Sequence, residues 1–153
     1  MLGFAGYYNQ SSITSKQGKD ILNDYRISED YRTIDPELKS FLQKKLLPDG
    51  IKSIPTIEFI KYKKGSKFML HRDRNVSTGN SPYRVKTLII QLSSKGNYKG
   101  GELVVEGKTM PQEKGSLIIF DSSCLHEVKE LKDGERFSLC LFLKKENLVL
   151  NLL

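Results

Sequence analysis

From residue 54 onward, short apolar segments alternate with turn-forming residues, and this pattern limits the possible folds more than any other feature of the chain. The apolar segments are rich in β-branched and aliphatic residues, which favour strands; they are 57–62, 85–92, 102–105, 116–120 and 137–143. Turn signals separate them, namely Lys64-Gly65, Thr78-Gly79-Asn80, Gly100-Gly101, Gly115 and Asp133-Gly134. Many short strands in succession predict a mainly β fold, a β-sandwich or jelly roll.

One helix is predicted before these strands. Asp35 can cap the free N–H groups of a first helical turn, and Pro36 suits the first helical position. An apolar stripe at helical spacing follows, made of Leu38, Phe41, Leu42 and Leu46. Pro48-Asp49-Gly50 should end the helix, whereas residues 1–34 are polar and irregular in pattern. We therefore expect a jelly roll with a supporting N-terminal helix packed outside it.

The length of 153 residues fits one domain, and no repeat, linker or low-complexity tract marks a boundary within 1–153. Lys and Arg total 25 against 18 Asp and Glu, a formal charge of +7, and the basic residues are scattered. A solvated surface with a basic bias is the simpler interpretation, and a face for nucleic acid or an acidic partner is the alternative.

The two cysteines, Cys124 and Cys140, lie in apolar surroundings without metal-binding spacing. Two buried thiols in a reducing compartment explain them most simply, although a disulfide between them stays open. No signal peptide or membrane span is expected. These features predict a cytoplasmic location and no membrane partner.

The chain contains two histidines, and both fall in a pattern suited to metal binding. His71 and Asp73 are two residues apart, so in an extended segment their side chains share one face. His126, from a distant segment, can complete the set. Two imidazoles and one carboxylate form the facial triad of non-haem iron(II) oxygenases, which leaves coordination sites open. A zinc site with the same ligands, or histidines that bind no metal, are the alternatives.

A second set of polar residues is suited to binding a cosubstrate that carries a carboxylate. Arg136 and Ser138 share one face of an otherwise apolar segment, and a guanidinium matches a carboxylate in shape and charge. We assign Arg136 to the far carboxylate of 2-oxoglutarate, with Ser138 assisting. Tyr62, Thr87 and Gln91 are further candidates, because Gln91 lies inside an apolar segment and a buried amide needs partners. A strand-edge arginine and a core tyrosine are the alternatives.

The chain resembles the iron(II)/2-oxoglutarate dioxygenase superfamily, in its prolyl 4-hydroxylase-like branch. The matching segments run in family order from about residue 54 to 143, and the N-terminal 50 residues match loosely as a supporting helix. They are Tyr62-Lys63-Lys64-Gly65, His71-Arg72-Asp73, Leu88-Ile89-Ile90-Gln91-Leu92-Ser93, Tyr98-Lys99-Gly100-Gly101-Glu102-Leu103, Gly115-Ser116-Leu117-Ile118-Ile119-Phe120, His126-Glu127-Val128 and Gly134-Glu135-Arg136-Phe137-Ser138.

The resemblance implies a single dioxygenase domain, with helical support in 1–53 and a catalytic double-stranded β-helix in 54–143. It implies iron(II) at His71, Asp73 and His126, 2-oxoglutarate at Arg136, oxygen as the oxidant, and often support by ascorbate. Relatives often have a tyrosine near Gln91 and a tryptophan near Phe142. The nucleic-acid dealkylating branch has a second arginine at the position of Phe142, so that branch is disfavoured.

The substrate rests on the resemblance alone, and a prolyl or other side chain of a protein or peptide is the first hypothesis. The polar segment from Arg74 to Arg84 should form a loop at the pocket mouth and select substrate through Arg74, Tyr83 or Arg84. A small-molecule or nucleic-acid substrate is the alternative within the family. A non-catalytic basic binding module with a vestigial metal site is the alternative outside it.

Overall fold

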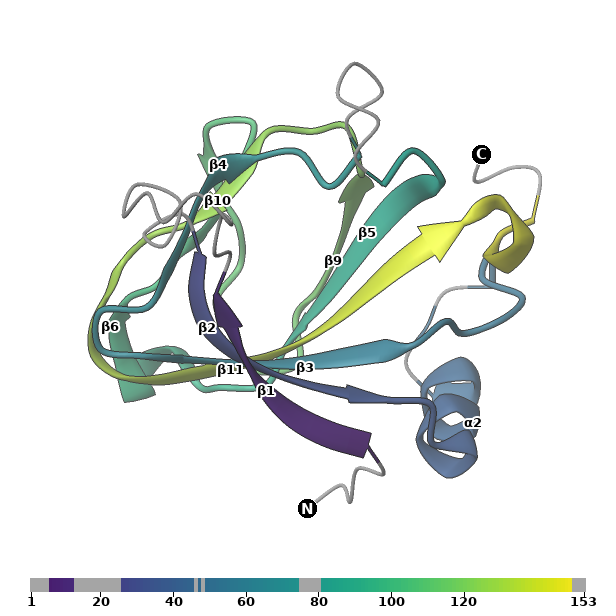
Figure 1. Cartoon of the computed structure of the whole chain (residues 1–153), viewed down its shortest axis with the longest axis horizontal. Helices are drawn as coiled ribbons and strands as arrows, with labels where there is room; N and C mark the ends of the chain where they lie inside the picture. The colour runs from purple at the N-terminus through teal and green to yellow at the C-terminus, as the bar shows by residue number, and fades with distance from the viewer. Residues whose placement is uncertain (1–5, 13–25, 46, 48, 75–80, 150–153) are drawn as a thin grey trace.

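The computed structural model describes residues 6–12, 26–45, 47, 49–74 and 81–149, and it is built almost entirely from antiparallel strands (Figure 1). The first strands along the chain are β1 (Gly6–Ser12), β2 (Arg26–Thr33), β3 (Ile57–Lys63), β4 (Lys67–His71) and β5 (Arg84–Gln91). The later ones are β6 (Tyr98–Gly100), β7 (Leu103–Val105), β8 (Lys108–Thr109), β9 (Leu117–Asp121), β10 (His126–Val128) and β11 (Leu131–Lys144). The helix α2 (Pro36–Lys45) lies between β2 and β3, and two short 3-10 helices span Lys95–Asn97 and Lys145–Asn147.

The strands pair in the order β8-β7-β10-β4-β2-β3-β11-β5-β9, and this sheet folds back on itself. Val105 of β7 and Ile118 of β9 stand near opposite ends of that order, yet both belong to one buried cluster with Ile60 and Ile89. Side chains from both ends can share a cluster only if the two parts of the sheet face each other. The fold is therefore a jelly roll, which confirms the predicted fold class.

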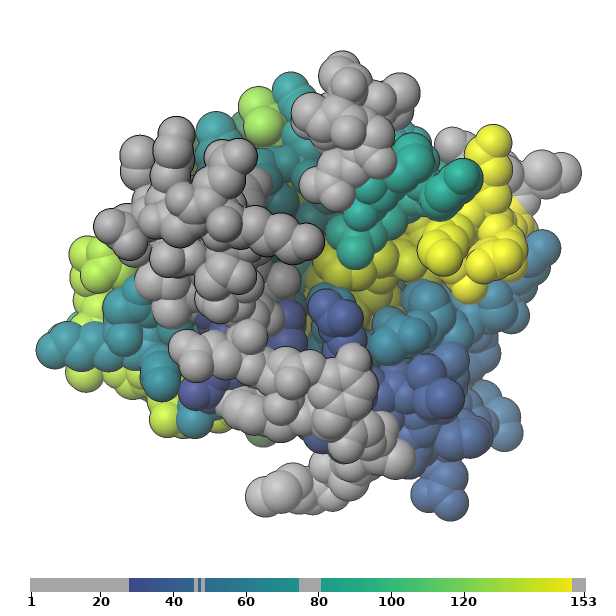
Figure 2. All heavy atoms as spheres, in the orientation of Figure 1, coloured from purple at the N-terminus to yellow at the C-terminus, as the bar shows by residue number. Residues whose placement is uncertain are grey.

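The helix covers the outer face of the sheet. Leu38 and Leu42 of α2 pack in a second cluster with Ile57, Leu88 and Leu141. The Asp35 carboxylate accepts a hydrogen bond from the Leu38 N–H at 3.0 Å, so the predicted N-cap is confirmed. Figure 2 shows α2 and the segment after it forming a continuous surface with the C-terminal end of β11.

The prediction that residues 1–34 are irregular was wrong for residues 6–12 and 26–33, which form strands. β1 and β2 pair with each other, and β2 also pairs with β3 and β4. Within residues 28–33 of β2, the buried side chains are polar, namely Ser28, Asp30 and Thr33. A strand that buries polar groups lacks the apolar alternation by which strands are recognised.

The turn predicted at Asp133-Gly134 was also wrong, because both residues lie inside β11. The β6–β11 register shifts between Leu131 and Asp133, which marks a β-bulge. Gly134 has a φ of 79°, and a Cβ there would lie 2.1 Å from the Asn97 carbonyl oxygen. The glycine therefore permits a bulge in a long strand, whereas the sequence pattern suggested a chain reversal.

Cys124 and Cys140 form no disulfide with each other in the structure; Cys140 is buried and Cys124 is half-buried. Within the described ranges, no helix has the length and apolar character that crossing a bilayer would require.

Candidate metal and cosubstrate site

Strands β4 and β10 bring the two histidines together. His71 ends β4 and His126 begins β10, and the two residues are direct partners in the antiparallel pairing. Their ring centroids lie 4.1 Å apart. Asp73 lies two residues beyond the end of β4, with Oδ1 3.3 Å from His71 Nε2 and Oδ2 3.2 Å from His126 Nε2. One ligand atom from each of the three buried residues lies within 4.8 Å of the others.

Backbone carbonyls fix the orientation of both imidazoles. His71 Nδ1 lies 2.7 Å from the Met69 carbonyl oxygen, and His126 Nδ1 lies 3.0 Å from the Cys124 carbonyl oxygen. A carbonyl can only accept, so Nδ1 carries a proton in both rings, and each Nε2 faces Asp73 as the nitrogen left to bind a metal ion once it is deprotonated. Metal-bound histidines typically have this second hydrogen bond. Both rings are thus held in the tautomer that a metal ion requires.

Neighbouring side chains restrict the three candidate ligands further. The Phe68 ring stacks on His71 at a centroid distance of 3.6 Å, and the Phe120 ring lies 4.8 Å from that of His126. The Thr87 hydroxyl donates to Asp73 Oδ2 at 2.6 Å. We had predicted Thr87 as a cosubstrate contact, but the structure places its hydroxyl against Asp73, where it orients the carboxylate.

The charges of the triad are coupled. Burial opposes ionisation of Asp73, but hydrogen bonds from His126, His71 and Thr87 outweigh it and lower the pKa of this carboxyl. Burial likewise opposes protonation of His126, yet the hydrogen bond and negative charge of Asp73 raise the pKa of this imidazole above its usual value. A proton on His126 therefore stands where a cation would bind.

Arg136 lies in the interior of the jelly roll and lacks a full set of partners. Its side chain is 1% exposed, and Tyr62 lies opposite it on β3, with the guanidinium 5.1 Å from the centre of the tyrosine ring. One N–H group donates to Gln91 Oε1 at 3.0 Å, whereas Nε and the other terminal nitrogen have no hydrogen-bond partner in the part of the chain that the structure describes. Buried guanidinium N–H groups without acceptors are costly. The carboxylate of 2-oxoglutarate would satisfy both, so the residues present fit this cosubstrate.

The other predicted cosubstrate contacts surround Arg136. Ser138 is buried on the same face of β11 and pairs with Gln91 across the strands. Gln91 uses its amide oxygen on Arg136 and its amide nitrogen on the Pro111 carbonyl, at 3.2 Å. Gln91 therefore positions the guanidinium, which explains its place in an apolar segment.

Tyr98 belongs to this site and was missing from the predicted site residues. Its side chain is buried, and its hydroxyl has no hydrogen-bond partner among the described residues. Burial raises the pKa of Tyr98 although the positive charge of Arg136 nearby lowers it, so the hydroxyl stays a neutral donor. The feature of the sequence that could have indicated Tyr98 is the pair Gly100-Gly101, two residues further on. Their φ angles of 73° and 68° bend the chain beside Arg136.

The three predicted substrate-binding residues do not form one cavity. Arg74 and Tyr83 line a cavity of about 610 Å³, and Arg74 pairs with Asp121 at 3.1 Å. Arg84 lines a different cavity of about 540 Å³. Lys144 lines both. Residues 75–80 of the predicted loop lie outside the described residues.

Comparison with known proteins agrees with this geometry. A family model of the 2OG-Fe(II) oxygenase superfamily matches residues 57–144. A PKHD-type hydroxylase of Prochlorococcus marinus is 33% identical over 133 residues, covering 84% of this chain and 53% of the relative. A PKHD-type hydroxylase of Shewanella baltica is 33% identical over 92 residues, covering 56% of this chain and 41% of the relative. The chain thus spans about half the length of the curated relatives it matches.

Solved structures share the fold. A prolyl-4-hydroxylase of Pseudomonas putida has a TM-score of 0.57 at 21% identity, covering 79% of this chain and 74% of that one. A prolyl hydroxylase of Trichoplax adhaerens, solved in complex with a hypoxia inducible factor peptide fragment, has a TM-score of 0.61 at 18% identity. That match covers 91% of this chain and 71% of the other.

Proposed function

Because this chain belongs to the 2OG-Fe(II) oxygenase superfamily, we propose that it hydroxylates a side chain of a protein or peptide, with proline as the first candidate. In this proposal His71, Asp73 and His126 hold iron(II), and Arg136 binds 2-oxoglutarate. The observation that carries the proposal is the convergence of three buried ligand atoms within 4.8 Å. Two imidazoles and a carboxylate are the ligand set that non-haem iron(II) oxygenases use.

In this proposal, one group of residues positions the metal ligands and another positions the cosubstrate. The Met69 and Cys124 carbonyls keep both Nε2 atoms available, and Thr87 fixes Asp73. Gln91 holds Arg136 in place for the distal carboxylate. When bound, iron and 2-oxoglutarate together supply oxygen activation, with conversion of the cosubstrate to succinate and carbon dioxide.

The substrate class is supported by the names of relatives. Curated relatives are called PKHD-type hydroxylases, and a structural neighbour was solved with a peptide. Both facts favour a protein or peptide substrate over a small molecule or nucleic acid.

Succinate release is the direct test. Purified protein with iron(II), 2-oxoglutarate, oxygen and ascorbate should form succinate, and mass spectrometry of treated proline-containing peptides should show the gain of one oxygen atom. His126→Ala should abolish both signals by removing a ligand. Glu127→Ala is the matched control, because Glu127 pairs with Lys129 at 2.9 Å and does not belong to the triad.

A wild-type protein that releases no succinate, or a His126→Ala variant that releases as much as wild type, would refute the proposal. In the first case, retained binding to nucleic acid or an acidic protein would favour a non-catalytic basic module. An anaerobic visible absorption band on adding 2-oxoglutarate to iron-loaded protein gives a second readout, independent of turnover.

A further inference from the structure

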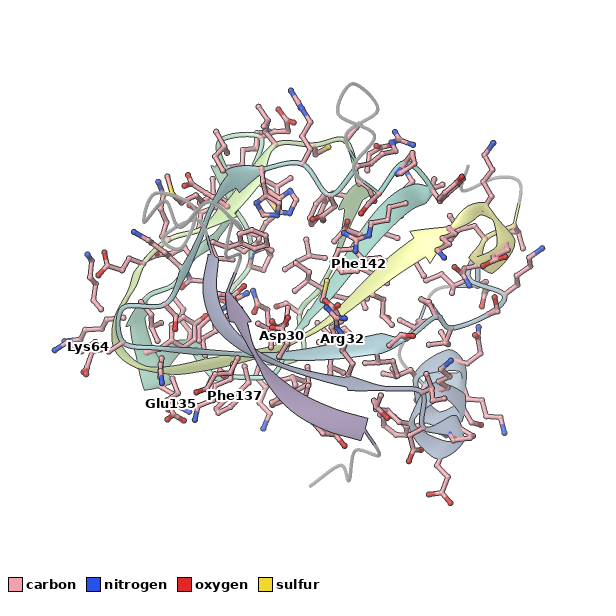
Figure 3. All side chains as sticks on the ribbon, viewed as in Figure 1. Asp30, Arg32, Lys64, Glu135, Phe137 and Phe142 are labelled. Atoms are coloured by element: carbon pink, nitrogen blue, oxygen red, sulfur yellow. The ribbon has the colours of Figure 1, made fainter. Side chains whose placement is uncertain are left out.

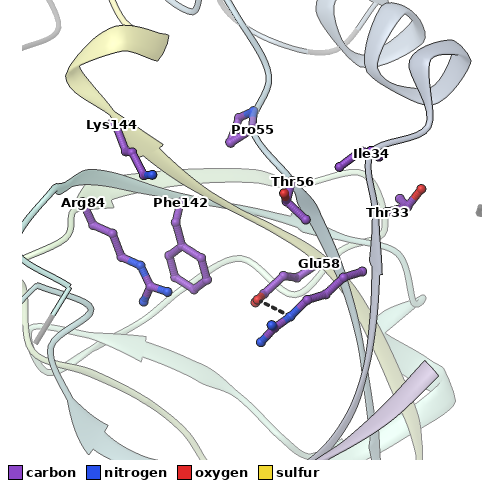
Figure 4. Close-up of a pocket in the computed structure, with 9 residues that line it drawn as sticks. Thr33, Ile34, Pro55, Thr56, Glu58, Arg84, Phe142 and Lys144 are labelled. Atoms are coloured by element: carbon purple, nitrogen blue, oxygen red, sulfur yellow. Dashed lines mark ion pairs between the residues drawn. The ribbon is translucent and has the colours of Figure 1, made fainter. Parts of the chain in front are cut away.

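A charged cavity of about 540 Å³ opens between the ends of β2, β3, β5 and β11 (Figure 4). Its charged lining residues are Arg32, Glu58, Arg84 and Lys144. Figure 4 shows Arg84 and Lys144 on the same side of the cavity as Phe142, with Glu58 on the opposite side. We call it the mouth pocket.

One lining residue of the mouth pocket neighbours a residue that contacts the candidate metal site. Phe142 of β11 is the direct strand partner of Thr87 on β5, so their side chains share one face. Thr87 donates its hydroxyl to Asp73 at 2.6 Å. Figure 3 shows Phe142 and Arg32 on the inner side of the curved sheet, with Glu135 and Phe137 on its outer side. Phe142 of the mouth pocket is therefore one strand away from Thr87, the residue that holds the carboxylate that we assign to iron.

The pocket has an excess of positive charge that nothing in it neutralises. Three cationic side chains and one carboxylate line it. Arg32 and Glu58 pair with each other at 3.1 Å, so this wall is close to neutral. Neither Arg84 nor Lys144 makes an ion pair with another described residue. The uncompensated charge is thus concentrated on the wall that carries Phe142.

Arg84 is held ready for an anion. The carbon at the centre of its guanidinium lies 3.6 Å from the centroid of the Phe142 ring, a stacked cation–π contact. Stacking restricts the long side chain before any ligand binds, which lowers the entropy cost of binding. The edge of the guanidinium, with its N–H groups, remains available to a carboxylate.

We propose that the mouth pocket binds an acidic side chain of the peptide substrate, next to the residue that is hydroxylated. Arg84 takes the carboxylate and Lys144 adds charge from the neighbouring position. This inference rests on the proposed function, because it names the substrate that the iron site would serve. The same carboxylate chemistry could come from a free amino acid, and the test separates the two sources.

The experiment uses pairs of proline-containing peptides that differ by Glu or Gln at one position within three residues of the proline. Wild-type protein, loaded with iron(II) and 2-oxoglutarate, should hydroxylate the best Glu peptide at least about tenfold better than its Gln partner, the worth of one charge-assisted hydrogen bond. Arg84→Gln and Lys144→Gln should each reduce this preference. Lys132→Gln is the matched control: it removes the same charge from a residue that pairs with Glu130 at 3.3 Å and lines neither the mouth pocket nor the cavity of Arg74 and Tyr83.

In addition to turnover, peptide affinity is measured by fluorescence anisotropy of labelled peptides added to manganese-loaded protein with 2-oxoglutarate. Equal affinity and turnover for Glu and Gln peptides, or a preference that survives Arg84→Gln, would overturn the inference. A preference for free proline over every peptide would assign the carboxylate to an amino acid and overturn the peptide substrate. Absence of succinate release with all substrates would refute the proposed function, while the anisotropy comparison would still decide whether the pocket selects a carboxylate.

Discussion

Replacement of Arg136 by methionine tests two effects of the buried guanidinium separately: its contribution to 2-oxoglutarate affinity and its effect on the free energy of unfolding. Two of its N–H-bearing nitrogens, Nε and one terminal nitrogen, lack acceptors among residues 26–45, 49–74 and 81–149. If the 2-oxoglutarate carboxylate supplies those acceptors, Arg136→Met removes charge-assisted hydrogen bonds worth about 3 kcal/mol, or roughly 100-fold in Kd. Without cosubstrate the variant also loses a poorly satisfied buried charge, so its unfolding free energy should stay within about 1 kcal/mol of wild type.

Titration calorimetry of 2-oxoglutarate into manganese-loaded protein measures the Kd, and denaturant unfolding without cosubstrate measures stability. Lys61→Met removes the same charge from the neighbouring strand, where Lys61 pairs with Glu135 at 3.4 Å, and should leave the Kd unchanged. A change in Kd below threefold for Arg136→Met would refute the assignment of this residue. Large destabilisation of the cosubstrate-free variant would refute the argument that the guanidinium is poorly satisfied.

Three further predictions concern the same site. Thr87→Val keeps the side-chain shape but removes the donor to Asp73, so manganese affinity should fall about tenfold in a metal titration, with unchanged affinity counting against this role. If the Tyr98 hydroxyl, which has no partner among the described residues, donates to the cosubstrate beside Arg136, Tyr98→Phe should weaken 2-oxoglutarate binding about fivefold in the same calorimetric assay. This factor corresponds to the loss of one hydrogen bond of about 1 kcal/mol. Because the pKa of His126 is raised, its charged form stabilises the metal-free protein at pH values below its ordinary pKa of 6.5, and this contribution is lost as pH rises through the pKa of the folded state. The Tm of metal-free protein in thermal unfolding should therefore fall as pH rises through this window. Manganese affinity should rise over the same window because the proton leaves the metal ligand, and an affinity that does not change with pH would contradict the coupling.

The sequence alone determined which residues could form the metal site. The spacing of His71 and Asp73, two residues apart, predicts a shared face in an extended segment, and His126 is the remaining histidine of the chain. Local rules also determined the capped helix and the main apolar strands. These features depend on neighbours in sequence, so pattern and composition were enough to predict them.

Tertiary structure decided the roles of polar residues that lie far from one another along the chain. Thr87 contacts Asp73, Gln91 contacts Arg136, and Tyr98 joins them, because strand register sets which buried groups meet. The polar strand β2 and the bulge at Gly134 likewise depend on distant partners. A hydrogen bond between strands depends on two segments and on their register, so it cannot be predicted from the sequence of either segment alone.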